Sequence, residues 1–176
     1  IQDRAAFEYI RALLREHSAM VVDESKAYLV AARVAPVMKR HGIASMTELV
    51  THLRGNAATL RTEVVDAMTI NETLWFRDIH PFETLRTSIL PDAMRRRATE
   101  RTLTIWSAAC SSGQEPYTIA ILLREHFPEL AGWNVRIIGT DLSGEMLAKA
   151  VAGIYTQTEM NRGMPAKLLV KYFQRV

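Results

Sequence analysis

The chain has 176 residues and a formal net charge of +3, with 48% hydrophobic and 23% charged residues. This composition is typical of a globular protein with one or two domains and excludes an extended disordered chain. The longest apolar runs, such as Tyr28–Ala32, are far too short to cross a membrane, and we expect no secretory signal. The single cysteine, Cys110, cannot form an internal disulfide. We therefore expect a cytoplasmic protein without membrane insertion.

The mild positive charge permits an acidic partner, but no zinc-finger or other recognisable nucleic-acid motif accompanies it, so no nucleic-acid partner is predicted. The five histidines are scattered without the spacing of metal ligands. No metal site is predicted.

The first hundred residues are predicted to be almost entirely helical. Apolar residues recur at helical spacing from Phe7 to Leu14, and Asp3 can cap that helix. A second helix is predicted over residues 24–41, ending at Gly42. Pro36 is expected to kink this helix or break it locally.

A third helix is predicted to begin at a capping box, in which Ser45 and Glu48 each satisfy a backbone N–H of the other. It runs toward Leu53 and is ended by Arg54-Gly55-Asn56. A fourth helix follows, with Leu60, Val64 and Met68 on one face.

Two prolines mark the connecting segment. Pro81 suits the first turn of a helix that continues to Leu90, and Pro91 interrupts or restarts the helix through Arg97. Together these elements predict a small helical bundle and a connecting helix.

After residue 102 the pattern changes to alternating strands and helices. The predicted elements are a strand at 103–107, a helix at 115–126, a strand at 135–140 and a helix at 144–152. Such alternation indicates parallel strands joined by right-handed crossovers, with ligands bound at the carboxyl ends of the strands. We therefore divide the chain into an all-α N-terminal domain (1–70), a linker with the connecting helix (71–101) and an α/β domain (102–176).

A run of small residues joins the first strand, predicted to be buried, to its helix. Small side chains from Ala108 onward let backbone N–H groups approach a ligand closely, and Gly113 tolerates the dihedral angles of a tight turn. Asp141 follows the second strand, where an acidic residue can bind the hydroxyls of a ribose. The alternative role of Asp141 is to cap the helix that starts at residue 143 or 144. Cys110 is predicted to line the turn rather than to act as a nucleophile.

These two blocks, preceded by Asn71-Glu72-Thr73-Leu74-Trp75-Phe76-Arg77, resemble the chemotaxis receptor methyltransferase family, CheR, over nearly the whole chain. The resemblance implies a Rossmann-like fold and the cofactor S-adenosylmethionine. It also implies methylation of glutamates on the cytoplasmic helices of chemotaxis receptors, giving glutamyl methyl esters and S-adenosylhomocysteine.

The resemblance further implies a set of site residues. Arg77 is the expected catalytic residue, and its guanidinium could bind either the methionyl carboxylate or the incoming glutamate. A surface ion pair is the alternative role of Arg77, but the flanking apolar run, Leu74–Phe76, would hold it in a partly buried wall. Trp75 and Phe76 are predicted as core residues. The expected cofactor-binding residues are Asn71, Thr73, Arg77, Ala108, Gly113, Glu115 and Asp141.

The second helix carries a possible docking surface. Lys26, Arg33 and Arg40 recur about every two helical turns, with Lys39 beside them, so these four basic residues share a stripe. A solvated helix face explains such a stripe equally well. The resemblance implies the other role, docking on the acidic methylation region of a receptor.

Two alternatives to this function remain open: a cofactor-binding signalling module without catalysis, and a methyltransferase with another acceptor. The two predicted strands cannot form a covered parallel sheet by themselves, because such sheets are buried and contain several strands. The resemblance implies further strands beyond Val176, so we expect this chain to be inactive alone.

Overall fold

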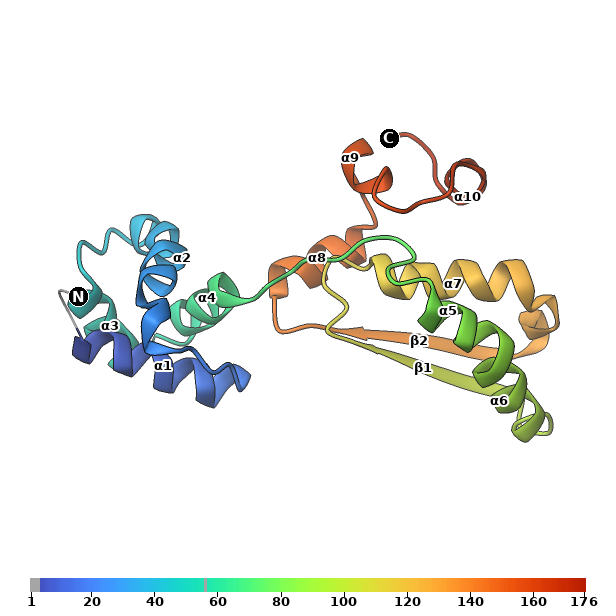
Figure 1. Cartoon of the computed structure of the whole chain (residues 1–176), viewed down its shortest axis with the longest axis horizontal. Helices are drawn as coiled ribbons and strands as arrows, with labels where there is room; N and C mark the ends of the chain where they lie inside the picture. The colour runs from blue at the N-terminus through green and yellow to red at the C-terminus, as the bar shows by residue number, and fades with distance from the viewer. Residues whose placement is uncertain (1–3, 56) are drawn as a thin grey trace. The chain divides into compact units, whose positions relative to one another are not determined.

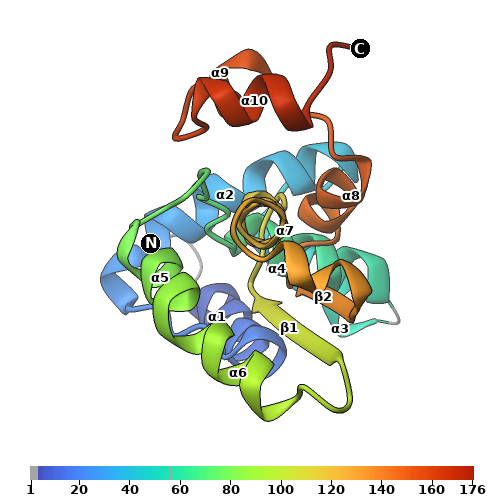
Figure 2. The same ribbon diagram turned by 90° about the vertical axis from the view of Figure 1, so that its right-hand side faces the viewer.

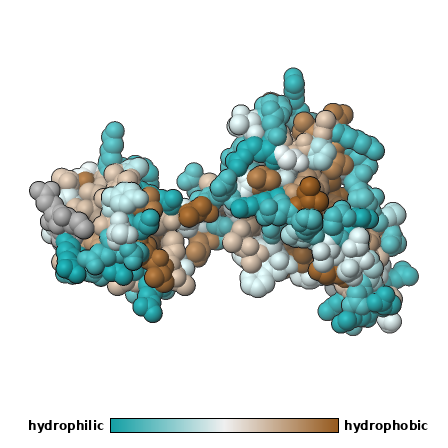
Figure 3. Space-filling view, in the orientation of Figure 1, coloured by the Kyte–Doolittle hydropathy of each residue, from teal (hydrophilic) through white to brown (hydrophobic). Residues whose placement is uncertain are grey.

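The computed structural model describes residues 4–55 and 57–176 (Figure 1). The chain divides into two compact units, residues 1–70 and residues 71–176. On the face of each unit seen in Figure 3, hydrophilic and hydrophobic side chains are interspersed. Among the described residues, no helix is both long and apolar enough to span a membrane.

The first unit is a bundle of helices around one apolar core. Its helices are α1 (Arg4–Ser18), α2 (Ala27–Arg40), α3 (Met46–Arg54) and α4 (Ala58–Met68), with a 3₁₀ turn at Glu24–Lys26 before α2. Each helix buries one apolar face, as the sequence periodicity predicts. The fully buried members of the core include Ile10, Leu14, Val30, Val34, Leu49 and Val64.

The start of α3 differs slightly from the predicted capping box. The Ser45 side chain accepts a hydrogen bond from the Glu48 N–H at 3.2 Å, which confirms Ser45 as the N-cap. The Glu48 carboxylate accepts from the N–H of Ala44 at 2.8 Å, one residue before the cap. The carboxylate thus satisfies a donor outside the helix and also lies in its positive first turn.

Helix α2 continues through Pro36 to Arg40, so Pro36 does not break it. The helix is followed by Gly42 at a φ of +67°, a left-handed conformation that glycine adopts without steric cost. The predicted cap Asp3 and the predicted helix-ending residue Asn56 lie outside the described residues.

In the second unit, α5 (His80–Thr84) and α6 (Leu90–Arg96) are joined by one π-helical turn, Leu85–Ile89. Within that turn the N–H of Leu90 donates to the carbonyl of Leu85. A proline ring clashes with the preceding helical turn and offers no N–H, so Pro91 is accommodated by widening the helix just before it. The helical segment therefore continues past Pro91 to Arg96 without interruption.

The predicted alternation of strands and helices is confirmed. Strands β1 (Thr102–Ala108) and β2 (Asn134–Thr140) pair in parallel, with Thr102 opposite Asn134 and Ala108 opposite Thr140. The helices of this part are α7 (Gln114–His126), α8 (Gly144–Ala152), α9 (Gln157–Met160) and α10 (Ala166–Tyr172). Because the strands are parallel and in register, both lead into the same edge of the sheet.

One face of the sheet is buried and the other is not. Leu103, Ile105 and other inward residues pack with residues of α7 and of the α5–α6 segment. Figure 2 shows these helices on one side of the strands. On the opposite face, Trp106 is 69% exposed and Ile138 is 39% exposed. The expectation of a buried first strand is therefore wrong for this face, because the helices described here cover only the other one.

Candidate functional site: the turn between β1 and α7

The turn between β1 and α7, residues 109–113, has an unusual backbone. Ala109, Ser111 and Gly113 have φ angles of 58°, 48° and 96°. Only the glycine adopts such angles freely; each of the other two residues costs about 1–2 kcal/mol. Residues 110–114 are nevertheless buried. Specific contacts must therefore hold this conformation.

The first contacts come from the end of β2. The N–H of Cys110 donates to the carbonyl of Thr140 at 2.9 Å, and the N–H of Gly113 donates to the carbonyl of Cys110 at 3.0 Å. A Cβ on Gly139 would lie only 3.0 Å from the sulfur of Cys110. The glycine at position 139 thus lets the turn lie directly against β2.

Asp141 joins this turn to the loop before α8. Its Oδ2 accepts from the N–H of Ser111 at 2.7 Å, and its Oδ1 accepts from the N–H of Ser143 at 2.9 Å. The N-cap of α8 is Ser143, whose hydroxyl accepts from the N–H of Met146. The alternative of Asp141 as the helix cap is therefore wrong. Each carboxylate oxygen can accept two hydrogen bonds, so Asp141 keeps capacity for a ligand hydroxyl.

Glu115 lies in the first turn of α7, where the helix dipole favours a negative charge. Its Oε1 accepts a hydrogen bond from the hydroxyl of Ser107 at 2.6 Å. Ser107 is only 2% exposed and was not among the predicted site residues. Its place at the end of a strand, just before the small-residue turn, is the sequence signal that could have identified it.

The environment of Cys110 disfavours a nucleophilic thiolate. Burial raises the pKa of the Cys110 thiol, and the nearby negative charges of Asp141 and Glu115 raise it further. The thiol therefore stays protonated at neutral pH. This supports the interpretation of Cys110 as a small residue of the turn.

The segment before α5 approaches the same turn. The hydroxyl of Ser111 donates to the carbonyl of Asn71 at 2.8 Å. A pocket of about 170 Å³ lies here. It is lined by Asn71, Glu72, Thr73, Ser112, Gln114, Met146, Lys149, Glu159 and Arg162. The structure thus brings Asn71 and Thr73 beside the turn.

Arg77 is exposed rather than held in a partly buried wall, with 54% of its side chain accessible. Its Nη1 donates to the carbonyl of Glu72 at 3.0 Å, and its Nε lies 3.8 Å from a carboxylate oxygen of Asp78. Only the apolar neighbours are covered: Trp75 is fully buried and Phe76 is half-buried. The tight backbone at Phe76, with a φ of 51°, separates the buried part from the exposed arginine.

The four residues of the basic stripe, three on α2 and Lys26 just before it, have different surroundings. Arg33 donates to the carbonyls of Met68 and Thr69, at 3.0 Å each. Arg40 pairs with Glu63 at 2.7 Å. Lys26 and Lys39 are exposed. Two of the four predicted docking residues therefore also stabilise the helical unit itself.

Comparison with known families identifies both units. Residues 71–176 match the CheR methyltransferase SAM binding domain. Residues 5–69 match the CheR methyltransferase all-alpha domain. The chain belongs to the CheR methyltransferase family. This confirms the predicted all-α domain followed by a Rossmann-like α/β domain, and S-adenosylmethionine as the cofactor of that domain.

Individual relatives agree. The chain is 44% identical to chemotaxis protein methyltransferase 1 of Pseudomonas aeruginosa, over 96% of this chain and 62% of the relative. It is 38% identical to a chemotaxis protein methyltransferase of Vibrio parahaemolyticus, over 99% of this chain and 63% of the relative. It is 31% identical to the chemotaxis protein methyltransferase of Borreliella burgdorferi, over 88% of this chain and 56% of the relative. The chain therefore spans less than two thirds of the length of these CheR relatives.

Proposed function

We propose that the protein containing this chain transfers a methyl group from S-adenosylmethionine to glutamate side chains of methyl-accepting chemotaxis receptors. The products are glutamyl methyl esters and S-adenosylhomocysteine. The observation that carries the proposal is the bond between Asp141, at the carboxyl end of β2, and the buried small-residue turn after β1. In a family of methyltransferases, this arrangement offers a ribose acceptor beside a backbone that a ligand can approach closely.

The residues around the turn fit the parts of S-adenosylmethionine. Asp141 would accept from the ribose hydroxyls, since its carboxylate oxygens retain acceptor capacity. Ala108 and Gly113 would allow close approach of the ligand, because neither carries a large side chain. Glu115, oriented by Ser107, would bind the amino group of the methionyl part. The list of proposed cofactor residues is completed by Asn71, Thr73 and Arg77.

Bound S-adenosylmethionine would supply a methyl group on a positively charged sulfur: an O–CH₃ bond to the acceptor would form as the CH₃–S bond opposite it breaks, leaving the thioether of S-adenosylhomocysteine. A glutamate is already ionised at neutral pH, so the protein needs no strong base. Its tasks are to align the reacting groups and to exclude water. Arg77 donates one hydrogen bond to the Glu72 carbonyl and has further N–H donors to hold a carboxylate. We assign Arg77 the catalytic role of positioning a carboxylate, either that of the methionyl group or that of the incoming glutamate.

We also propose that the helical unit binds the receptor. Acidic methylation segments would meet the stripe of Lys26, Arg33, Lys39 and Arg40. Arg33 and Arg40 already make contacts within the helical unit, which pairing with a receptor would compete with. Lys26 and Lys39 are exposed and available for such pairing. This substrate would place the enzyme in the cytoplasm.

The test is to incubate the complete protein with methyl-labelled S-adenosylmethionine and receptor, and to measure methanol released by base. Release of labelled methanol is expected. Arg77→Ala should abolish it, whereas Arg86→Ala, at a half-buried arginine paired with Glu83, should not. Binding of S-adenosylhomocysteine without methanol release would instead indicate a non-catalytic module. Base-stable label on another molecule would indicate a different acceptor.

A further inference from the structure

The turn is also held by a contact from the segment that follows α8. The hydroxyl of Tyr155, which follows α8, donates to the carbonyl of Ser112 at 2.7 Å. Because Ser112 is 5% exposed, its carbonyl has little access to water and depends on this donor. Tyr155 thus replaces solvent at Ser112, which lies between two residues with positive φ angles, Ser111 and Gly113.

Gly113 leaves the space that the Tyr155 hydroxyl occupies. A Cβ at position 113 would lie 2.9 Å from the Tyr155 oxygen and 2.9 Å from the Cβ of Ala150. The glycine therefore serves two purposes. It adopts a φ of 96° and admits both the tyrosine hydroxyl and the side of α8.

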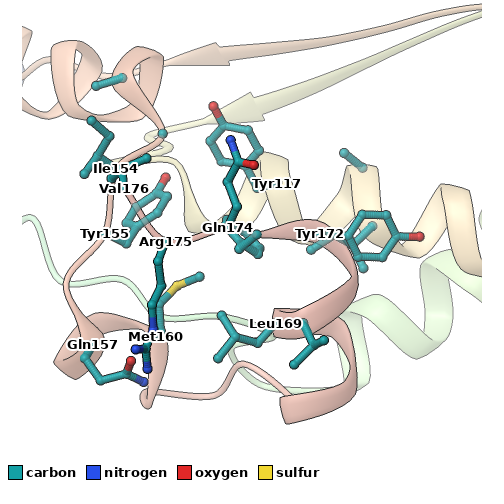
Figure 4. Close-up of a pocket in the computed structure, with 16 residues that line it drawn as sticks. Tyr117, Ile154, Tyr155, Gln157, Met160, Leu169, Tyr172, Gln174, Arg175 and Val176 are labelled. Carbon is teal, nitrogen blue, oxygen red and sulfur yellow. The ribbon is translucent and has the colours of Figure 1, made fainter.

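The Tyr155 ring is itself fixed by other aromatic rings. Its centroid lies 5.0 Å from that of Trp75, 6.2 Å from that of Tyr117 and 6.5 Å from that of Phe173, each in edge-to-face geometry. Tyr117 and Tyr155 line one pocket of about 880 Å³ (Figure 4). Burial raises the pKa of the Tyr155 phenol, so the hydroxyl remains a donor.

Ser111 and Ser112 are consequently bound from two directions. The Asp141 carboxylate holds the N–H of Ser111, and the Tyr155 hydroxyl holds the carbonyl of Ser112. Both contacts join residues of the chain itself, so neither needs a ligand atom to hold the turn in this conformation. A fixed turn loses less conformational entropy when a ligand binds.

We propose that Tyr155 is a positioning residue, which preorganises the turn between β1 and α7 for S-adenosylmethionine by holding the Ser112 carbonyl. This role rests on the proposed function and deepens it. Tyr155 acts through the backbone of Ser112, not by contact with the reacting atoms.

Tyr117 offers a matched control. Its hydroxyl donates to the carbonyl of Ala150 at 2.9 Å, so it joins α7 to α8 without bonding to Ser112. Tyr155→Phe and Tyr117→Phe each remove one half-buried phenolic hydrogen bond and keep the aromatic ring. Both variants should fold and should lose similar thermal stability.

The experiment measures two quantities in the complete protein: calorimetric affinity for S-adenosylhomocysteine, and amide hydrogen exchange at residues 111–113. Tyr155→Phe should weaken affinity about tenfold relative to Tyr117→Phe and accelerate exchange at these residues. Equal affinities and exchange in the two variants would overturn the positioning role alone. If the parent protein did not bind S-adenosylhomocysteine, the cofactor assignment would be overturned and the positioning role with it. Amide hydrogen exchange at residues 111–113 would still show whether Tyr155 orders the turn.

Discussion

The carbonyl oxygen of Trp75 occupies the place where a side chain on Gly163 would begin. A Cβ at position 163 would lie 2.2 Å from that oxygen, and Gly163 has a φ of +97°. The neighbouring Arg162 carbonyl accepts from the Trp75 N–H at 3.1 Å, so the two segments are pressed together along their backbones. Position 163 therefore tolerates only glycine.

Gly163→Ala should destabilise the α/β unit by about 2–4 kcal/mol, because it combines a backbone collision with a strained dihedral angle. Gly132→Ala is the control, since a Cβ there would meet nothing within 4 Å. Thermal or urea unfolding of both variants measures the difference. Equal stability of the two would contradict the close approach of Gly163 to Trp75.

Asp141→Ala should weaken binding of S-adenosylhomocysteine roughly ten- to a hundredfold, because ligand hydroxyls and the N–H of Ser111 both lose their acceptor. Isothermal calorimetry gives the affinity. Ser143→Ala removes the cap of α8 but leaves the carboxylate, so it should lower stability by about 1 kcal/mol with little change in affinity. Unchanged affinity in Asp141→Ala would remove that residue from the proposed site.

Arg33→Ala should lower the free energy of unfolding of the helical unit by about 1–3 kcal/mol, because the carbonyls of Met68 and Thr69 lose a charged donor. Lys39→Ala, on the same helix, should change it by less than about 0.5 kcal/mol. Chemical unfolding followed by circular dichroism compares them. If both variants matched the parent, the Arg33 contacts would be of no consequence to stability.

Receptor docking is therefore tested better with the two lysines than with the arginines. Exchanging Lys26 and Lys39 for Glu should slow receptor methylation roughly two- to tenfold at low salt by weakening electrostatic attraction. The effect should diminish as the Debye length falls below about 8 Å. Affinity for S-adenosylhomocysteine serves as the control and should stay the same. If this double variant methylated the receptor at the parent's rate in dilute buffer, the stripe would be a solvated helix face without a docking role.

Glu63 should make the helical unit sensitive to acid. The hydrogen bond from Arg40, followed by that from His41, lowers the pKa of the Glu63 carboxyl in the folded protein. A lowered pKa means stability that is present above the unfolded value of about 4.3 and is lost as pH falls through the folded value. Glu63→Gln should therefore flatten the decline in stability below that pH. Parallel pH profiles for the parent and the variant would contradict this linkage.

Local rules predicted much of the fold. The cap at Ser45, the left-handed glycine after α2 and the order of strands and helices depend on short-range chemistry, and the structure confirms them. The π-helical turn before Pro91 was not predicted, since a proline can interrupt, restart or widen a helix depending on what packs around it. Likewise, α2 continues through Pro36 because the apolar face of this helix is buried against the other helices of the unit.

The candidate site was predictable in its residue types and less so in its contacts. Asp141 and the small-residue turn stand out because their positions relative to the strands have chemical meaning. The hydrogen bonds from Ser107 to Glu115 and from Tyr155 to Ser112 were not predictable. Serine and tyrosine hydroxyls can bond to many partners, and the sequence does not show which partner lies nearby. Arg33 shows the converse. Helical spacing predicts on which face of α2 its guanidinium lies, but not that this guanidinium already donates to the carbonyls of Met68 and Thr69 at the end of α4.

The contrast between Trp75 and Trp106 provides an optical signal for the state of the second unit. Trp75 is fully buried and packs edge-to-face against the rings of Tyr155 and Phe173, whereas Trp106 is mostly exposed on the open face of the sheet. An indole in an apolar site emits at shorter wavelengths than one in water. Replacing Trp106 and Trp133 by Phe would leave Trp75 as the single tryptophan, and its emission would report directly on the packing around Tyr155.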